Sequence, residues 1–232
     1  MQATDILILS NGPGEVTTWV RPVVKALRQQ LGDNRAVVRI SVVLSPCPNA
    51  TGNEAAIAKS YPEVDRVQGA EDFFPFLLWG KTAQNWDWRD KGVVVFLGGD
   101  QFFPVVIGKR LRYRTVVYAE WDARWHAWID RFGVMQAKMI ADAPKKYAHK
   151  LTVVGDLMAD VGLQVEEGLQ VSRLQVERSN LQSSTSSNLQ PLQTFKPSTP
   201  SNLQPSTELI GILPGSKPAK LAQGVPLTLA IA

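Results

Sequence analysis

The sequence is poor in the residues that build disulfides and metal sites. Its 232 residues include one cysteine, Cys47, and two histidines, His126 and His149. A single cysteine excludes an internal disulfide and is typical of a reducing compartment. These three side chains do not supply the ligands of a Cys/His zinc site. We therefore expect neither a metal nor a cofactor.

Long hydrophobic runs and a strong excess of charge are also missing. No apolar run approaches the roughly 18 residues that a transmembrane helix needs. The start of the chain, residues 1–5, lacks the basic segment of a signal peptide. A formal net charge of +4 is too weak to indicate nucleic-acid binding, although it favours an anionic membrane surface or a phosphate. We expect a cytoplasmic protein with at most a peripheral contact to the cytoplasmic membrane face.

What the sequence does contain, over residues 5 to 160, is a regular alternation of apolar runs and helical patterns. Strands are predicted at 6–9, 36–44, 64–67, 93–97, 115–119, 132–135 and 151–155, and helices at about 16–30, 53–60, 103–111 and 125–129. The run 93–97 does not alternate between apolar and polar residues, which indicates a strand buried on both faces. The pattern predicts an α/β fold, a doubly wound parallel sheet with a Rossmann-like arrangement.

The first strand leads into a glycine-rich loop that contains Asn11, Gly12, Gly14 and Glu15. A strand, such a loop and a helix together can bind an anion at the helix N-terminus. The loop is not the dinucleotide motif GxGxxG, so a tight turn without a ligand is an equal alternative. Pro22 would kink a helix begun at residue 16, or would fit the first turn of a helix begun later.

Acidic residues follow the next two central strands. Asp100 comes after Gly98-Gly99 at the end of the strand 93–97, and Glu120 and Asp122 come after the strand 115–119. Open α/β sheets bind ligands at the carboxyl ends of their strands, so these carboxylates are expected at one crevice. The alternative for Gly98-Gly99-Asp100 is a turn with a polar tip.

An aromatic segment at 72–80 contains Phe73, Phe74 and Trp79, and two further tryptophans follow at 86 and 88. Basic residues at 81, 89 and 91 border it. Such a segment is suited to acyl chains or to a membrane interface. The alternative is that it packs in the core or covers a sheet edge.

The composition changes at about residue 162. Residues 163–207 are rich in Ser, Gln, Asn, Thr and Pro and repeat Ser-Asn-Leu-Gln, which predicts a flexible low-complexity insert. A strand is expected again at 208–213, followed by Pro-Gly-Ser-Lys at 214–217, a loop suited to phosphate. Residues 208–232 cannot form a domain alone. We expect a first lobe at 1–162, the insert at 163–207, and an incomplete second lobe at 208–232.

Four of these segments, at 11–15, 98–100, 154–160 and 213–217, occur in the order found in lipid-A-disaccharide synthase. The chain therefore resembles this family of B-type-fold glycosyltransferases over residues 5–160 and 208 to about 222. Two positions depart from the family pattern: Asp156 stands where the family usually has His, and Lys217 where it has Arg, which loses a planar fork for a diphosphate. Most of the second lobe is absent.

The resemblance implies a UDP-sugar donor and a lipid-linked acceptor sugar. It assigns acceptor binding to Asn11, Gly12, Gly14, Glu15, Phe73, Phe74 and Trp79, and nucleotide-sugar binding to Gly215, Ser216 and Lys217. In the implied inverting, metal-independent transfer, a carboxylate takes the proton of the attacking hydroxyl. Asp100 is the first candidate for this base, with Glu120 or Asp122 as substitutes.

Two other functions remain open on the sequence. The chain can be a non-catalytic truncated acceptor lobe that binds lipid or a partner protein, which the missing second lobe favours. It can also belong to another B-type-fold enzyme, such as a UDP-sugar epimerase.

Overall fold

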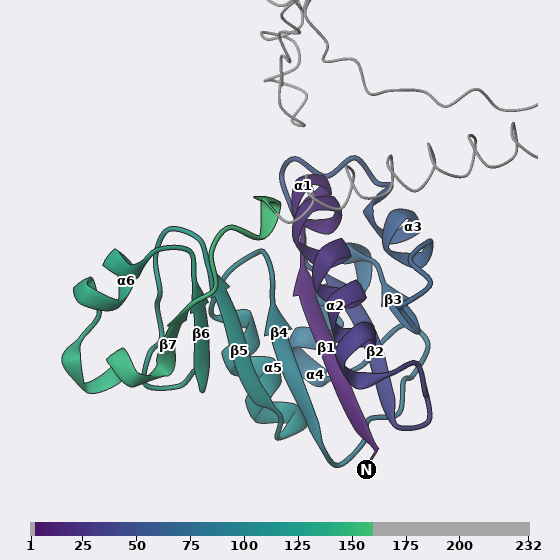
Figure 1. Ribbon diagram of the computed structural model, residues 1–232. Coiled ribbons are helices and arrows are strands. Elements are labelled where there is room, and N and C mark those ends of the chain that lie inside the picture. The colour runs from purple at the N-terminus through teal and green to yellow at the C-terminus, as the bar shows by residue number, and fades with distance from the viewer. Residues whose placement is uncertain (1–2, 160–232) are drawn as a thin grey trace, which may run out of the picture. The chain divides into compact units, whose positions relative to one another are not determined.

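The computed structural model describes residues 3–159, which form one seven-stranded sheet with helices on both faces (Figure 1). The strands are β1 (Thr4–Ser10), β2 (Val38–Leu44), β3 (Arg66–Gln68), β4 (Gly92–Phe96), β5 (Arg114–Ala119), β6 (Arg131–Val134) and β7 (Leu151–Val153). Their order is β3-β2-β1-β4-β5-β6-β7. All neighbours are parallel. The predicted α/β fold with a doubly wound parallel sheet is confirmed.

The centre of the sheet is β1, which lies between β2 and β4. Ile8 of β1 is opposite Val42 on one side and Val95 on the other. Six of the seven β1 residues are buried, as expected for a strand whose two faces are both covered. The chain therefore moves outward in one direction from β1 to β3, and in the other from β4 to β7.

The helices divide between the two faces. On one face lie α1 (Pro13–Glu15), the π-helix η1 (Val16–Val20), α2 (Arg21–Leu31) and α3 (Glu54–Lys59), and on the other lie α4 (Phe73–Trp79), α5 (Phe103–Leu111) and α6 (Ala137–Asp142). Figure 1 shows α2 and the pair α4 and α5 on opposite sides of the sheet. Two 3-10 helices, η2 (Ala70–Asp72) and η3 (Lys145–Lys150), complete the described elements.

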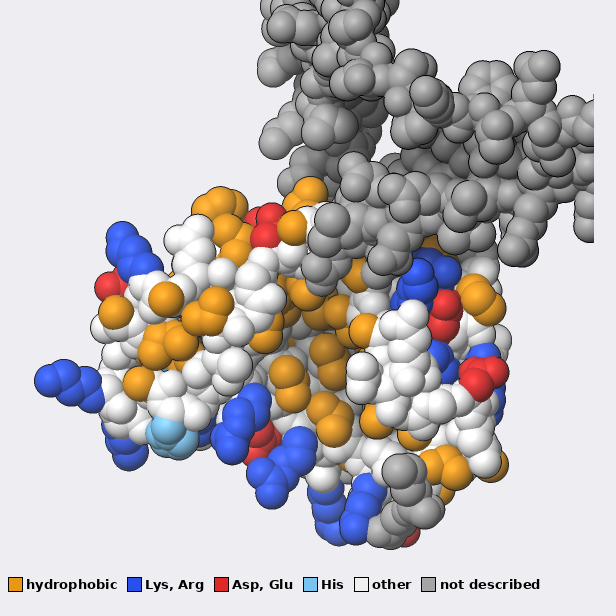
Figure 2. Space-filling view, viewed as in Figure 1, with side chains coloured by type: hydrophobic (Ala, Val, Ile, Leu, Met, Phe, Trp, Pro, Cys, Tyr) orange, Lys and Arg blue, Asp and Glu red, His pale blue; other side chains and the backbone are white. Residues whose placement is uncertain are grey.

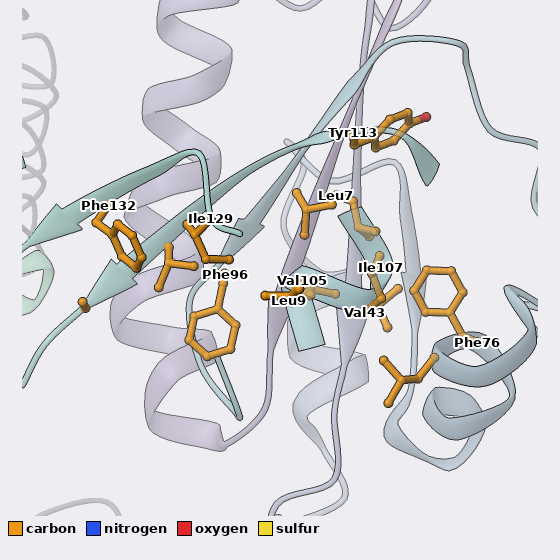
Figure 3. Packing of buried hydrophobic residues seen from close by; sticks show 14 of the residues in the cluster. Leu7, Leu9, Val43, Phe76, Phe96, Val105, Ile107, Tyr113, Ile129 and Phe132 are labelled. Carbon is orange, nitrogen blue, oxygen red and sulfur yellow. The ribbon is translucent and has the colours of Figure 1, made fainter. Parts of the chain in front are cut away.

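Alternate residues of the central strands enter two separate cores. Leu7 and Leu9 of β1 pack with Phe76 of α4 and Ile107 of α5 (Figure 3). Ile6 and Ile8, which point the other way, pack under η1 and α2. This division follows from the period of two in a strand, and it explains why the apolar runs show no alternation.

Pro22 lies inside a helical segment that is unbroken from α1 to α2, and the π-helix η1 precedes it. The N–H of Arg21 bonds the carbonyl of Val16, five residues earlier. Because proline has no N–H, the four-residue spacing could not continue through Pro22, and the wider turn fits this gap. Helix α2 begins at Arg21, so Pro22 lies in its first turn, as the second sequence alternative had it, and the π-helix η1 leads into that turn.

Other predicted elements need correction. The helix expected at about 125–129 is a turn, in which the N–H groups of Trp128 and Ile129 both bond the carbonyl of Trp125. Trp125 has a positive φ of 60°, which ends helical geometry at once. Helix α6 was not predicted. Strand β3 is shifted toward Gln68, and β7 ends at Val153.

The sheet face toward α2 is not covered equally along its width. Val93 and Val95 of β4 and Val116 of β5 point to this face and are only half-buried. Figure 2 shows hydrophobic side chains gathered over β4 and β5, where Figure 1 draws no helix in front of the strands. The opposite face of the same strands is buried under α5.

Candidate functional site

A cavity of about 240 Å³ lies at the carboxyl ends of β1, β4 and β5. We call it the switch-point cavity, because β1 and β4 are the neighbours from which the chain departs in opposite directions. Ligands of doubly wound sheets bind at this place. It is lined by Asn11, Glu15, Trp19, Phe96, Gly98, Gly99, Gln101, Tyr118, Glu120, Trp121, Asp122 and Arg124.

The loop after β1 brings the Glu15 carboxylate close to the backbone. A Cβ atom on Gly12 would lie 2.4 Å from Oε2 of Glu15 and 3.3 Å from Sγ of Cys47. A larger residue at position 12 would therefore require the Glu15 carboxylate to move. Of the four residues predicted in this loop, Asn11 and Glu15 line the cavity, whereas Gly12 and Gly14 are not among its lining residues.

The two glycines after β4 allow the loops of three strands to meet. Gly98 and Gly99 have φ angles of 157° and 109°. A Cβ on Gly98 would lie 2.6 Å from Oδ1 of Asn11, and one on Gly99 would lie 2.7 Å from Oγ of Ser45. The absence of a Cβ at both positions therefore lets the side chains of Asn11 and Ser45 approach this turn.

Asp100 follows these glycines but does not line the cavity. Its side chain is exposed, and Oδ1 accepts a hydrogen bond from the Phe102 N–H at 2.8 Å. This local bond stabilises the loop before α5. The structure thus places Asp100 in a turn with a polar tip, which was the alternative interpretation of the sequence.

Glu120 and Asp122 do line the cavity, from the loop after β5. Gln101, which is 6% exposed, holds this loop in place. Its Nε2 donates to the Asp122 carbonyl at 2.8 Å, and its Oε1 accepts from the Arg124 N–H at 2.8 Å. Sequence reasoning missed Gln101, although a polar residue next to a Gly-Gly turn was a signal for it.

Asp122 has a second partner in Arg124, with Nε 3.0 Å from Oδ2. Both side chains are more than half exposed, so this ion pair contributes little to stability. It does occupy one carboxylate oxygen of Asp122.

Two aromatic side chains form the side of the cavity toward η1. The rings of Trp19 and Tyr118 meet edge to face, with centroids 5.3 Å apart. Tyr118 Oη donates to the Gly155 carbonyl at 3.3 Å and accepts from the Leu157 N–H at 3.4 Å. The segment 155–157, part of the family-like motif at 154–160, is thereby tied to the cavity.

The environment of Tyr118 keeps its phenol protonated. Burial raises the pKa of the Tyr118 hydroxyl and outweighs the lowering effect of the Leu157 hydrogen bond, and the charges of Asp156 and Glu120 add smaller increases. Tyr118 therefore acts as a hydrogen-bond donor near neutral pH.

Several polar atoms beside the cavity have no hydrogen-bond partner within residues 3–159. They are Asn11 Oδ1, Trp19 Nε1 and, at the end of β1, Ser10 Oγ. Buried polar atoms are almost always paired with protein, water or ligand. Asn11 and Trp19 line the cavity, so one unpaired acceptor and one unpaired donor lie beside it.

The aromatic segment is split between core and surface. Phe73 is fully buried and packs against Phe103, with ring centroids 4.8 Å apart. Phe74 and Trp79 are 52% and 66% exposed. Phe73 thus matches the alternative interpretation of a core residue, and only Phe74 and Trp79 of the three predicted aromatics present their rings at the surface.

A second group of exposed aromatics lies near α5. Phe102 packs on Trp125, and Trp125 stacks on Trp128, with centroids 4.9 and 5.7 Å apart. Lys109 Nζ lies 4.3 Å from the centre of the Trp128 ring. Three aromatic rings and one ammonium group thus form a single exposed cluster beside α5.

The remaining predictions concern other parts of the chain or an absence. Gly215, Ser216, Lys217 and the insert at 163–207 lie outside the described residues, as does the boundary at 162. Between residues 3 and 159, no three His, Cys, Asp or Glu side chains come together as a metal site. No helix in that part of the chain has the length and apolar character needed to cross a membrane.

Comparison with known proteins gives no relative. The chain matches no protein-family model, no curated protein and no solved structure.

Proposed function

We propose that this chain is the acceptor-binding lobe of a glycosyltransferase, which moves a sugar from a UDP-sugar to a lipid-linked acceptor sugar. The observation that carries the proposal is the switch-point cavity, where Glu15, Glu120 and Asp122 meet the glycine loops of β1 and β4. Carboxylates and unpaired polar atoms around one cavity suit a ligand with many hydroxyl groups.

The proposed chemistry needs one general base. Glu120 lines the cavity at the end of β5, and we assign this role to it in place of Asp100. The carboxylate takes the proton of the acceptor hydroxyl while the hydroxyl oxygen attacks the anomeric carbon. The bond from that carbon to the diphosphate breaks, and UDP leaves. Asp100, which bonds the Phe102 N–H, then acts as a positioning residue for the loop.

The lipid-linked nature of the acceptor is supported by the exposed side of α4. Phe74, Leu78 and Trp79 are each more than half exposed. A Cβ on Gly80, the next residue, would lie 2.9 Å from Cδ of Arg110, so a cation borders this apolar surface. An apolar surface with a basic border suits a peripheral contact with an anionic membrane.

A second candidate function is lipid binding without catalysis, and the same exposed aromatics favour it. In that case the cavity would hold the acceptor headgroup and no transfer would follow. The two candidates differ in whether UDP is released.

The test is UDP release from UDP-N-acetylglucosamine by the full chain, with an N-acylated glucosamine acceptor in detergent micelles. We expect Glu120→Gln to lower the rate at least about 100-fold, the usual contribution of a general base. Asp100→Asn is expected to lower the rate less than tenfold. Glu71→Gln, at an exposed glutamate of η2, is the matched control.

The outcomes separate the candidates. Acceptor binding without UDP release supports the lipid-binding lobe. Release that Glu120→Gln leaves unchanged removes Glu120 from the mechanism, and release abolished by Asp100→Asn restores Asp100 as the base.

A further inference from the structure

A second cavity of about 230 Å³ adjoins the switch-point cavity. We call it the flanking cavity, and it is lined by Trp121, Asp122, Ala123, His126, Met139, Asp142, Ala143 and Pro144. Trp121 and Asp122 line both cavities. A ligand that extends past these two residues can therefore occupy both spaces.

The imidazole of His126 is held firmly at this cavity. Its ring stacks on Tyr147 with centroids 5.8 Å apart and contacts Phe132 at 5.3 Å. Lys150 Nζ donates to the His126 carbonyl at 2.8 Å. The ring is fixed by packing on its faces, which leaves its nitrogens for hydrogen bonding.

His126 Nε2 is buried and has no partner within the described part of the chain. Burial, with a smaller effect of the Lys150 charge, lowers the pKa of His126. The imidazole is therefore neutral at pH 7 and can exchange one hydrogen bond with a hydroxyl group. A buried polar atom without a partner is costly, so a ligand hydroxyl here would be stabilising.

The other walls of the flanking cavity match a sugar ring. Trp121 is 75% exposed and stands between the two cavities, so its ring offers a flat apolar surface for one face of a pyranose. Asp122 and Asp142 supply carboxylate acceptors for hydroxyl groups. Met139 and Ala143 supply the apolar wall that is usual in small-molecule sites.

We infer that the flanking cavity is a second saccharide subsite, so that the acceptor extends over two sugar-sized units on either side of Trp121. The inference rests on the proposed function of the switch-point cavity, which holds the first unit. His126 Nε2 and the Asp142 carboxylate bind hydroxyl groups of the second unit.

The test uses the two histidines as separate NMR probes in the full chain. His126 lines the flanking cavity, whereas His149 is exposed on η3. Titration with N-acetylglucosamine is expected to shift the His126 Hε1 resonance in a saturable way and to leave His149 unchanged. The Trp19 indole N–H, identified by its loss in Trp19→Phe, reports the switch-point cavity in the same titration.

Three variants sharpen the assignment. Asp142→Asn, at an exposed position, is expected to weaken the His126 response about fivefold, because it replaces a charged acceptor by a neutral one. His126→Phe keeps the ring packing and removes the nitrogen. Binding of N-acetylglucosamine, followed by the Trp121 indole N–H resonance, should then be weaker by a similar factor. Glu120→Gln is expected to weaken the Trp19 response and to change the His126 response by less than twofold.

A Trp19 shift without a His126 shift would overturn the second subsite and leave the proposed function standing. No shift at either probe would overturn both. A His126 shift that Asp142→Asn leaves unchanged would also contradict the assignment.

Discussion

The two ends of the sheet differ in whether their buried polar groups have hydrogen-bond partners. At the amino end, Asp5 is fully buried and every oxygen of its carboxylate is hydrogen-bonded. At the carboxyl end, Asn11 Oδ1 and Trp19 Nε1 are buried with no partner in residues 3–159. Because both ends belong to one sheet, the difference separates polar groups that are paired within the fold from polar groups that, in the proposed function, would pair with a ligand.

The amino-end network is dense. Arg39 donates to both oxygens of Asp5, at 2.8 and 2.9 Å, and Tyr113 Oη and the Arg89 N–H donate to Oδ2 at 2.9 and 3.0 Å. Burial would raise the pKa of Asp5, but these hydrogen bonds outweigh it and lower the pKa. The network joins β1 and β2 to Arg89, in the segment before β4, and to Tyr113, the residue before β5.

The largest effect is expected from Asp5→Ala. Removal of the carboxylate leaves Arg39 and Tyr113 without their buried partner, which costs about 3–5 kcal/mol in the free energy of unfolding. Urea denaturation followed by circular dichroism measures this loss. Asp87→Ala is the control, because Asp87 also contacts Arg39 but is 78% exposed, and about 1 kcal/mol or less is expected.

The same carboxylate predicts a pH dependence. Because the pKa of Asp5 is lowered in the folded state, its contribution to stability is present above the ordinary value near 3.8 and is lost as the pH falls through the folded-state pKa. As the pH is lowered from 5 to 2, the midpoint urea concentration of unfolding should fall more steeply for the natural chain than for Asp5→Asn. Parallel curves would contradict the assignment.

Tyr113→Phe tests the network with a smaller change. The Tyr113 hydroxyl lies 2.9 Å from Asp5 Oδ2 and 2.7 Å from the Arg89 carbonyl, two acceptors for its single proton, and its loss should cost about 1–3 kcal/mol. Thermal or urea unfolding provides the measurement. Tyr147→Phe, on η3, is the matched control and should change stability by less than about 0.5 kcal/mol.

The carboxyl end should respond differently to a similar truncation. Asn11→Ala removes a buried oxygen that has no partner in the described residues, so the free energy of unfolding should change by no more than about 0.5 kcal/mol. Binding of N-acetylglucosamine should weaken about tenfold. A loss of stability like that of Tyr113→Phe would mean that the two ends do not differ as described.

The smallest effect concerns His126. Its pKa is lowered in the folded state by burial and by Lys150, while the carboxylates of Asp122 and Asp142 share its cavity. The neutral ring therefore contributes stability that is present above pH about 6.5 and is lost as the pH falls through the folded-state pKa. The urea midpoint of His126→Phe should change less than that of the natural chain between pH 7 and pH 5.

The fold could be predicted because most of its strands are continuous apolar runs in the sequence. The runs at 93–97 and 115–119 became β4 and β5, and Glu120 and Asp122 were expected at the cavity because they follow such a run. The helix expected at 125–129 failed because Trp125 takes a positive φ, which an apolar spacing does not reveal.

The residues that support the site were harder to predict from the sequence. Trp19 reaches the cavity from a π-helix, whose wider turn changes the phase of the residues around it. Gln101 is defined by hydrogen bonds to a loop more than 20 residues away. Asp100 and Gln101 are neighbours in the chain, and only the folded loop shows that the amide, not the carboxylate, is turned inward.

The central position of β1 also has a consequence for how the protein is made. Its partners on the two sides are β2, which ends at Leu44, and β4, which ends at Phe96. During synthesis on a ribosome, β1 can pair on one side long before its second partner emerges, and its open edge waits for about 50 more residues. Nascent chains that stop before β4 should therefore depend on chaperones, and chains released after β4 should need them less.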